Sequence, residues 1–383
     1  MGVACSGPQG PAGSGGTPGP TGATGPAGPP GMNGGSPDLA PLEARVAAIE
    51  AGDLADQLAA LTSRTDQLEA ALTAQSAELV ALRQQLAQAP TVIAADRTLT
   101  VTANPAGADQ FGDLPAALAS LSRSWISPGV RVTISITGNQ PFVHGRPIVI
   151  DHPQSERIFI QGASATPPIL IFDGFGQAGD DAFAVGSGAV LNLDRVALSW
   201  VGPVCPARCG VAVHATWGGV AHMGSDVSIS GFHIGLYAEF AGAIRADGIE
   251  ITNTVFSISS AYGSVVSAQD ARIQGAGAGL EAFGGAVLLA SDSRVEAGNN
   301  GLQGGVGGVV ICDRCAMANN TVLGFTAGSG ALVVANFSSA SGSDTCYGAS
   351  EGGTILANGA TTNGCDQSYS PAPGPNPGVV VRP

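Results

Sequence analysis

Four aspartates recur about 22 residues apart and form the acidic group with the clearest chemical potential: Asp247, Asp270, Asp292 and Asp313. Two arginines, Arg272 and Arg294, follow two of them closely. Paired carboxylates supply the acid and the base of glycosidic-bond cleavage, and carboxylates can also hold the calcium of a polysaccharide lyase. Aspartate is equally a preferred turn residue, and surface Asp–Arg pairs contribute little stability. A structural role in turns is therefore favoured, with catalysis as the alternative.

Trp217 marks a second candidate site, because His214, His222 and His233 lie near it in the chain. Aromatic side chains combine a large apolar face with a defined geometry. We therefore expect Trp217, with Arg272 and Arg294, to contact a sugar ligand. The competing interpretation is a set of scattered, half-buried side chains.

Six of the seven cysteines fall into close pairs: Cys205 with Cys209, Cys312 with Cys315, and Cys346 with Cys365. A zinc site would need the first two pairs together, but the repeat described below places them several coils apart. Local disulfides in an oxidising compartment are predicted instead. A redox-active Cys312–Cys315 pair is a further alternative, without the sequence context of a thioredoxin.

Cys5 is the unpaired cysteine, in the sequence Val3-Ala-Cys-Ser6. This segment resembles the end of a bacterial lipoprotein signal, which implies lipidation of Cys5 and membrane anchoring through it alone. Gly2 stands where such signals usually carry leucine, and the hydrophobic region is missing. The alternatives are a free or interchain cysteine and an N-terminal myristoylation motif. Residues 1–6 are thus an anchor or the remnant of a signal.

The composition is that of an exported fibrous protein. Of 383 residues, 57 are Gly and 25 are Pro, only 11% are charged, and the net charge is -14 with every basic residue an arginine. A strongly acidic chain without a basic run is a poor partner for nucleic acid or an anionic membrane. No stretch of about 18 apolar residues predicts a transmembrane helix.

Residues 7–36 carry glycine at every third position from Gly7 to Gly34, with prolines between. Only glycine fits at the axis of three wound polyproline-II chains, so this register predicts a collagen-like triple helix and a homotrimer. Residues 37–90 then predict an α-helical coiled coil. Leucines alternate steps of three and four there, and Pro90 ends the helix.

From residue 91 to 345 the sequence predicts a β-solenoid. Repeat units of 22 to 25 residues begin at Gly210, Gly235, Ser257, Gly279, Gly301 and Gly324. Three apolar patches recur at fixed offsets within each unit, which is typical of one coil with three short strands. Residues 113–122 predict an amphipathic helix that covers the open end. Residues 346–383 are expected to form a C-terminal cap and a Pro-rich tail.

Three segments carry a resemblance to a known fold: Phe111-Gly-Asp-Leu-Pro-Ala-Ala-Leu, Gly129-Val-Arg-Val-Thr-Ile-Ser-Ile and Ile158-Phe-Ile-Gln-Gly. They resemble the first coils of right-handed parallel β-helices of the pectate-lyase-like superfamily. The heads of phage tail-spikes and tail fibres and exported bacterial β-helix lipoproteins are the most similar members. The resemblance implies the fold, whereas chemistry varies among its members.

In three strands, successive residues are all apolar, although they must face opposite sides of the sheet: Val287–Leu289, Val309–Ile311 and Leu332–Val334. Some of these apolar side chains must therefore face outward, and an exposed apolar stripe is unfavourable on a soluble monomer. In a trimer it would pack between heads. The alternative is that the C-terminal segment from Ser343 covers it.

The expected protein is therefore a homotrimeric fibre of the bacterial cell surface, the extracellular space or a virion tail. Its head is expected to be structural or adhesive and to meet a polysaccharide or cell-surface glycan, with no cofactor apart from the calcium alternative. The competing function is a polysaccharide lyase or glycoside hydrolase of the tail-spike type.

Overall fold

The computed structural model describes residues 39–50, 53–138, 141–173, 181–201, 210–371 and 378–381. The chain divides into two compact units, Met1–Ala87 and Gln88–Pro383. The predicted anchor at 1–6 and the collagen-like segment at 7–36 lie outside the described residues.

The first unit contains two helices, α1 (Ala40–Glu50) and most of α2 (Asp53–Gln88). The leucines of the heptad seam are solvent-exposed in the single chain, from 52% for Leu82 to 77% for Leu86. These leucines recur at heptad spacing, so they form an exposed apolar seam along α2. No helix in the described part of the chain is long and apolar enough to cross a bilayer.

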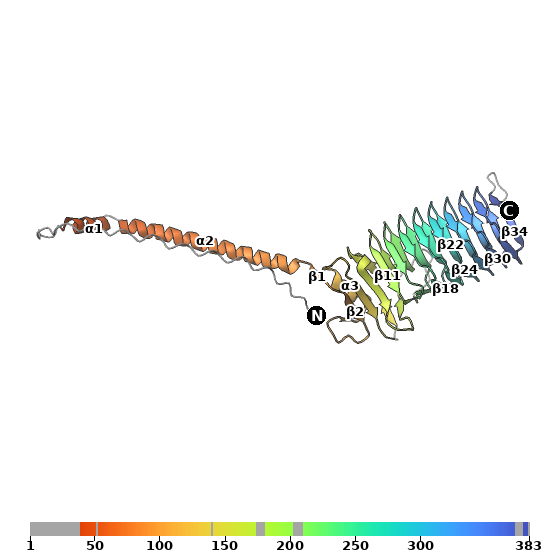
Figure 1. The fold of residues 1–383 in the computed structure, drawn as a ribbon, viewed down its shortest axis with the longest axis horizontal. Helices are drawn as coiled ribbons and strands as arrows, with labels where there is room; N and C mark the ends of the chain where they lie inside the picture. The colour runs from red at the N-terminus through yellow and green to blue at the C-terminus, as the bar shows by residue number, and fades with distance from the viewer. Residues whose placement is uncertain are drawn as a thin grey trace, which may run out of the picture. The chain divides into compact units, whose positions relative to one another are not determined.

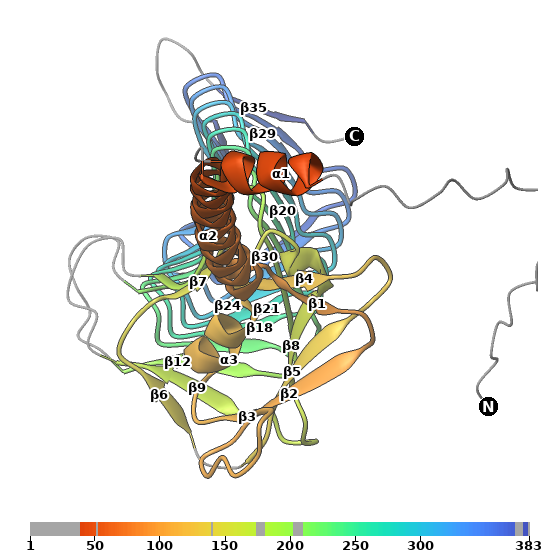
Figure 2. The ribbon, with the colours of Figure 1, turned by 90° about the vertical axis from the view of Figure 1, so that its left-hand side faces the viewer.

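The head, residues 91 onward, is a parallel β-helix, as Figures 1 and 2 show. Its strands stack into three parallel sheets of 10, 13 and 10 strands, which we call the first, second and third sheets. Each coil contributes one strand to each sheet in turn. We call the turns from the first to the second sheet the first corner, and those from the second to the third sheet the second corner.

The first sheet contains β7 (Ile148–Ile150), β10 (Asp181–Val185), β13 (Val211–Thr216), β16 (Ile234–Glu239), β19 (Phe256–Ala261), β22 (Ala278–Phe283), β25 (Asn300–Gly304), β28 (Leu323–Ala327), β31 (Thr345–Ala349) and β34 (Gln367–Pro371). The second sheet contains β2 (Arg97–Val101), β3 (Gln110–Phe111), β5 (Val132–Ile136), β8 (Ile158–Gly162), β11 (Val190–Asp194), β14 (Val220–Met223), β17 (Ala243–Arg245), β20 (Val265–Ser267), β23 (Val287–Leu289), β26 (Val309–Ile311), β29 (Leu332–Val334), β32 (Thr354–Leu356) and β35 (Val379–Val381). The third sheet contains β6 (Phe142–His144), β9 (Ile169–Phe172), β12 (Ala197–Trp200), β15 (Ser228–Ser230), β18 (Glu250–Thr252), β21 (Arg272–Gln274), β24 (Arg294–Glu296), β27 (Ala316–Ala318), β30 (Ser339–Ser341) and β33 (Thr361–Asn363).

The core consists of columns of apolar side chains, one residue per coil. Strand residues alternate between the interior and the surface, so each three-residue strand of the second sheet from β20 to β32 buries only its central residue. The column of the first sheet is Val213, Leu236, Ile258, Leu280, Leu302, Phe325 and Tyr347, all fully buried. Phe325 and Tyr347 stack with their ring centroids 4.8 Å apart. Residues at equal positions in successive units are therefore direct neighbours in space.

The first repeat unit is shifted by two residues from the predicted alignment. Leu236 pairs with Val213, whereas the unit beginning at Gly210 had aligned it with Val211. On the third sheet, Ile251 pairs with Ile229. Val211 instead belongs to a separate apolar cluster with Ile234. The Gly–apolar dipeptide at this position therefore resembles the repeat without sharing its register.

A helix, α3 (Leu114–Leu121), lies in the segment expected to cap the solenoid. The Asp113 carboxylate accepts a hydrogen bond from the Ala116 amide at 2.7 Å, and Pro115 stands in the first turn, which is the pattern that starts a helix. Leu114 and Leu121 are fully buried. Nearby, β1 (Thr91–Ile93) pairs with β4 (Ser124–Ile126), and a 3₁₀ turn covers Ser155–Arg157.

The solenoid continues beyond residue 345, where a cap and a tail were expected. Strands β31 to β35 extend the three sheets as far as Val381. Within residues 346–371 and 378–381, the C-terminal segment thus lengthens the solenoid.

Candidate functional site

Three aromatic rings stack on one another at the first corner. Trp217 and Phe240 have ring centroids 4.7 Å apart and planes 13° apart, and Phe240 and Tyr262 follow at 5.1 Å and 8°. Their exposed fractions are 67%, 38% and 46%. We call these three residues the aromatic ladder. It is a continuous, solvent-facing aromatic surface that crosses three coils.

The backbone of the corner produces this stacking. Trp217, Phe240 and Tyr262 all have φ near +50° and occupy the same turn position in successive coils. Because stacked strands lie about 4.8 Å apart, side chains at equal positions are placed at ring-stacking distance. A left-handed conformation is unfavourable for an aromatic residue, and the contacts between neighbouring rings offset part of that cost.

The residues that flank the aromatic ladder at its two ends differ. Gly284 occupies the next turn position, and a Cβ there would lie 3.0 Å from Cδ1 of Tyr262. Phe283 meets Tyr262 edge-on at 5.5 Å. In the preceding coil the corresponding residue is Ser187, whose side chain is small and exposed. The preceding coil therefore carries a small polar residue at this turn position, and Trp217 is the most exposed ring of the ladder.

A charged cluster lies beside the ladder on the outer side of the first sheet. The Nδ1 atom of His214 lies 2.7 Å from Asp181 Oδ2, and its Nε2 atom lies 3.2 Å from Glu239 Oε1. The Tyr237 hydroxyl donates to Glu239 at 2.8 Å. Burial alone would lower the pKa of His214, but the hydrogen bonds and charges of Asp181 and Glu239 outweigh it and raise the pKa.

The ladder and the charged cluster adjoin each other at Glu239 and Phe240. Aromatic rings present electron-rich faces and apolar area, while the Glu239 carboxylate, in the residue directly before Phe240, is held by Tyr237 and His214. Both imidazole nitrogens of His214 are occupied by carboxylates. These contacts hold the imidazole ring and its charge in place.

The other two histidines are separated from His214. His222 lies on the outer side of the second sheet, where it lines a groove of about 530 Å³ with Arg131, Asn192 and Arg245. His233 lies before β16 at the corner that joins the third sheet to the first, and burial lowers its pKa. The structure therefore does not gather the histidines around Trp217.

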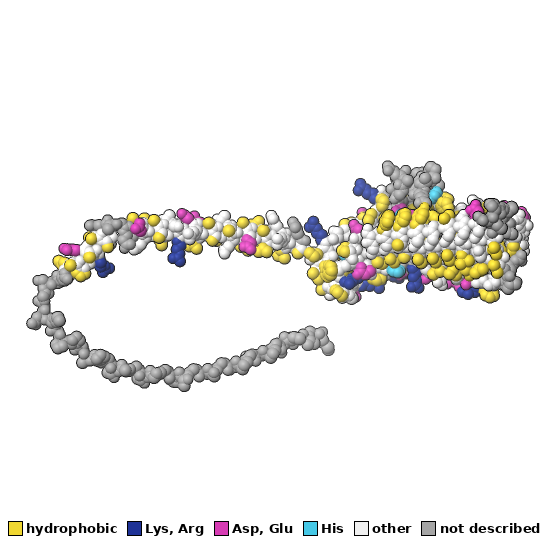
Figure 3. All heavy atoms as spheres, turned by 90° about the horizontal axis from the view of Figure 1, so that it is seen from above, with side chains coloured by type: hydrophobic (Ala, Val, Ile, Leu, Met, Phe, Trp, Pro, Cys, Tyr) yellow, Lys and Arg dark blue, Asp and Glu magenta, His cyan; other side chains and the backbone are white. Residues whose placement is uncertain are grey.

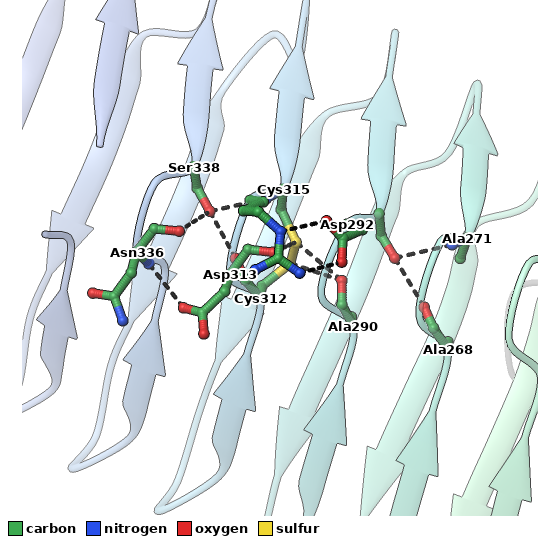
Figure 4. A network of polar contacts seen from close by, with 11 residues as sticks. Ala268, Ala271, Ala290, Asp292, Cys312, Asp313, Cys315, Asn336 and Ser338 are labelled. Atoms are coloured by element: carbon green, nitrogen blue, oxygen red, sulfur yellow. Dashed lines mark hydrogen bonds and ion pairs between the residues drawn. A yellow bond between two sulfur atoms is a disulfide. The ribbon is translucent and has the colours of Figure 1, made fainter. Parts of the chain in front are cut away.

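The four predicted aspartates do lie together, at the second corner. Asp270 and Asp292 are turn residues with φ of 56° and 65°. The Asp292 carboxylate accepts two hydrogen bonds from Arg314, at 2.6 and 2.5 Å, and Asp313 accepts one from the Asn336 amide at 3.1 Å (Figure 4). These contacts link the turns of successive coils to one another.

Two of these carboxylates are held in the ionised form. Hydrogen bonding and charge from Arg314 lower the pKa of Asp292. Partial burial would raise the pKa of Asp247, but hydrogen bonds from Ser267, Arg245 and the Gln269 amide outweigh it and lower the pKa. A carboxyl that acts as general acid needs the opposite shift, toward neutral pH. This arrangement favours a structural role.

The predicted arginines lie on the outer side of the third sheet and face away from the ladder's corner. Arg272 and Arg294 are register partners on β21 and β24, and Arg294 forms an ion pair with Glu296. Both side chains are solvent-exposed. They do not share a site with Trp217, which lies at the first corner.

Two of the predicted disulfides are present. Cys312 and Cys315 span a second-corner turn with Cα atoms 5.6 Å apart, beside Ser338 (Figure 4). Cys346 and Cys365 join successive coils, with Cα atoms 5.8 Å apart. Cys5, Cys205 and Cys209 lie outside the described residues. Within the ranges that the structure describes, no three His, Cys, Asp or Glu side chains are arranged to hold a metal ion.

Sequence reasoning identified Trp217 but missed Phe240, Tyr262, Asp181 and Glu239. The ladder had a signal, since its three residues are 23 and 22 residues apart and each precedes a small turn residue. Comparison with known proteins adds no assignment: no protein-family model, characterised protein or solved structure matches this chain.

Proposed function

We propose that this protein is a homotrimeric fibre of the cell surface, extracellular space or virion tail, whose β-helix head binds glycans along the aromatic ladder. The observation that carries the proposal is the stack of Trp217, Phe240 and Tyr262, whose side chains are between 38% and 67% exposed. Contiguous exposed apolar patches mark binding surfaces, whereas single exposed hydrophobic side chains are common. The collagen-like register and the exposed heptad seam of α2 support three copies.

The proposal includes a right-handed coil and membership of the pectate-lyase-like superfamily. The three-sheet parallel solenoid with helix α3 near its N-terminal end supports it. It also includes lipid attachment at Cys5 as the anchor of a cell-surface form, supported by the sequence Val3-Ala-Cys-Ser6.

The test is binding of the full chain to an array of acidic and neutral polysaccharides, followed by titration of the best ligand. Trp217→Ala removes the most exposed ring of the ladder and about 1 kcal/mol of aromatic contact with the ligand. We therefore expect this variant to bind the ligand about fivefold more weakly. Phe337→Ala is the matched control, because Phe337 is 70% exposed at the second corner and has no recorded ring partner among the described residues. Equal affinities of the two variants would contradict the proposal.

The same incubation separates binding from degradation. Release of reducing ends or unsaturated products, lost in Asp270→Asn or Asp292→Asn with the fold unchanged, would replace the binding function with a lyase or hydrolase. We expect retention of the polysaccharide without release of product.

A further inference from the structure

The outer side of the second sheet is apolar over its C-terminal coils. In β23, β26, β29, β32 and β35 the central residue of each strand points inward and the two flanking residues point outward. Every outward residue except Thr354 is aliphatic, and we call this set the apolar face: Val287, Leu289, Val309, Ile311, Leu332, Val334, Thr354, Leu356, Val379 and Val381.

The face narrows in the earlier coils from two apolar columns to one, because the column that contains Val287 continues through Val265, Ala243 and Val220. The column that runs from Leu289 to Val381 is polar in the earlier coils, where its members are His222, Arg245 and Ser267. Along one side of the face run the ionised turns of the second corner. An apolar surface bordered by charges on one side has the apolar core and part of the polar rim of a protein–protein interface. Figure 3 shows hydrophobic side chains gathered in rows along the head.

The described C-terminal segment does not cover this face. Residues from Ser343 onward form further coils, and β32 and β35 add Leu356, Val379 and Val381 to it. Val379 and Val381 are 53% and 42% exposed. The C-terminal coils therefore enlarge the surface that a partner must cover.

We infer that the occupant is a second and a third copy of this chain, with the three apolar faces packed around a common axis. The inference rests on the proposed homotrimer and names its contact surface. Only Ala89 and Pro90 separate α2 from β1, so an assembled coiled coil tethers the heads at high effective concentration. The face carries no charge, so copies of a chain with net charge -14 can meet there without apposing carboxylates.

The two columns of the face match what threefold symmetry requires. A closed ring of three copies needs two different patches on each copy, one for each neighbour. Residues i and i+2 of a strand lie roughly 7 Å apart on the same face. The column that contains Val309 can therefore contact one neighbour while the column that contains Ile311 contacts the other.

Disulfide cross-linking of the full chain tests this arrangement. In a Cys5→Ser background, Val309→Cys with Ile311→Cys is expected to give covalent trimers under mild oxidation, seen on a non-reducing gel. The control is Ser339→Cys with Ser341→Cys, which likewise flank a buried central residue, Ala340, on β30 of the third sheet. The control is expected to stay uncross-linked.

The mass of the reduced protein, measured in solution beforehand, distinguishes the ways in which the inference fails. A trimeric mass without cross-links, or cross-links limited to dimers, would overturn the threefold packing of the apolar face and leave the trimeric, glycan-binding fibre standing. A monomeric mass would overturn the inference and the proposed trimer together. Glycan binding by the cross-linked trimer would show that the ladder at the first corner stays accessible.

Discussion

At the scale of single residues, one turn position explains most of the candidate site. The position occupied by Trp217, Phe240 and Tyr262 becomes Gly284 and then Val306 in the following coils, always with positive φ. A sequence reader could isolate Trp217 because tryptophan is rare in this chain. Phe240 and Tyr262 can be assigned to the site only once the register of the coils is known, because only the register shows that their rings stack on Trp217 and on each other.

The charged cluster could not have been predicted from spacing. Asp181, His214 and Glu239 lie on three successive strands of the first sheet, but the separations between them, 33 and 25 residues, differ from each other and from the regular repeat. The longer first interval reflects the irregular coils before residue 210. The aspartates of the second corner, by contrast, were predicted to be neighbours because their coils are regular.

His214 makes the stability of the head depend on pH. Its pKa in the folded head is raised above 6.5 by Asp181 and Glu239, against the opposing effect of burial. The imidazolium therefore stabilises the fold fully below about pH 6.5, and this contribution is lost as the pH rises through the higher folded value. We expect the difference in unfolding temperature between the wild type and His214→Gln to shrink as the pH rises across that range.

Thermal unfolding followed by circular dichroism at several pH values measures this difference. His222→Gln serves as the control, because His222 is exposed on the second sheet and has no recorded carboxylate partner among the described residues. A difference for His214→Gln that is constant with pH, or that grows as the pH rises, would show that the cluster does not stabilise a charged imidazole.

At the scale of elements, the sequence was most informative where the coils are regular. From Gly235 onward the three apolar patches predicted for each unit are strands of the three sheets, because a strand that stacks on its copy repeats its side-chain pattern. The errors fall where this regularity ends. The unit at Gly210 was misaligned by two residues, and the coils after residue 345 were missed because threonine and asparagine replace aliphatic residues in β33.

The Cys346–Cys365 disulfide is expected to stabilise the last coils specifically. It closes a loop with a sequence separation of 19 residues, for which the loss of unfolded-state entropy corresponds to about 3 kcal/mol. Each coil contacts mainly its neighbours, so the loss of stability in Cys346→Ala/Cys365→Ala should be confined to the C-terminal coils. Hydrogen exchange resolved by peptide measures this.

The Cys312–Cys315 pair provides the comparison. It spans a separation of only 3 residues within one turn, so Cys312→Ala/Cys315→Ala should affect exchange less than the loss of the long-range disulfide. Faster exchange of the whole head in Cys346→Ala/Cys365→Ala would contradict local stabilisation and indicate one cooperative unit.

At the scale of the whole molecule, the stalk is expected to convert weak contacts into strong binding. Three ladders on one fibre make the second and third binding events intramolecular, which raises the apparent affinity for a polymer by roughly 10²-fold or more. Leu72→Asn/Leu79→Asn places two polar residues in the exposed heptad seam of α2 and should yield monomers with the same affinity for a short oligosaccharide. Their affinity for the long polysaccharide should fall.

Analytical ultracentrifugation and titration with short and long ligands check this together. The control is Glu78→Gln, which also alters a side chain of α2 but lies outside the leucine seam. This variant should remain trimeric and keep its affinity for both ligands. Monomers that retain full affinity for the long polysaccharide would contradict the multivalent mechanism.

The stacking of similar coils also determines how the length of such a head can change in evolution. Residues 22 apart in sequence are neighbours in space, as Asp292 and Arg314 are, so one coil is a complete genetic module. An in-frame duplication of a regular coil inserts a strand into every sheet and leaves all other contacts between neighbours intact. Lineages can therefore lengthen or shorten the head, and with it the aromatic ladder and the apolar face, in single mutational events.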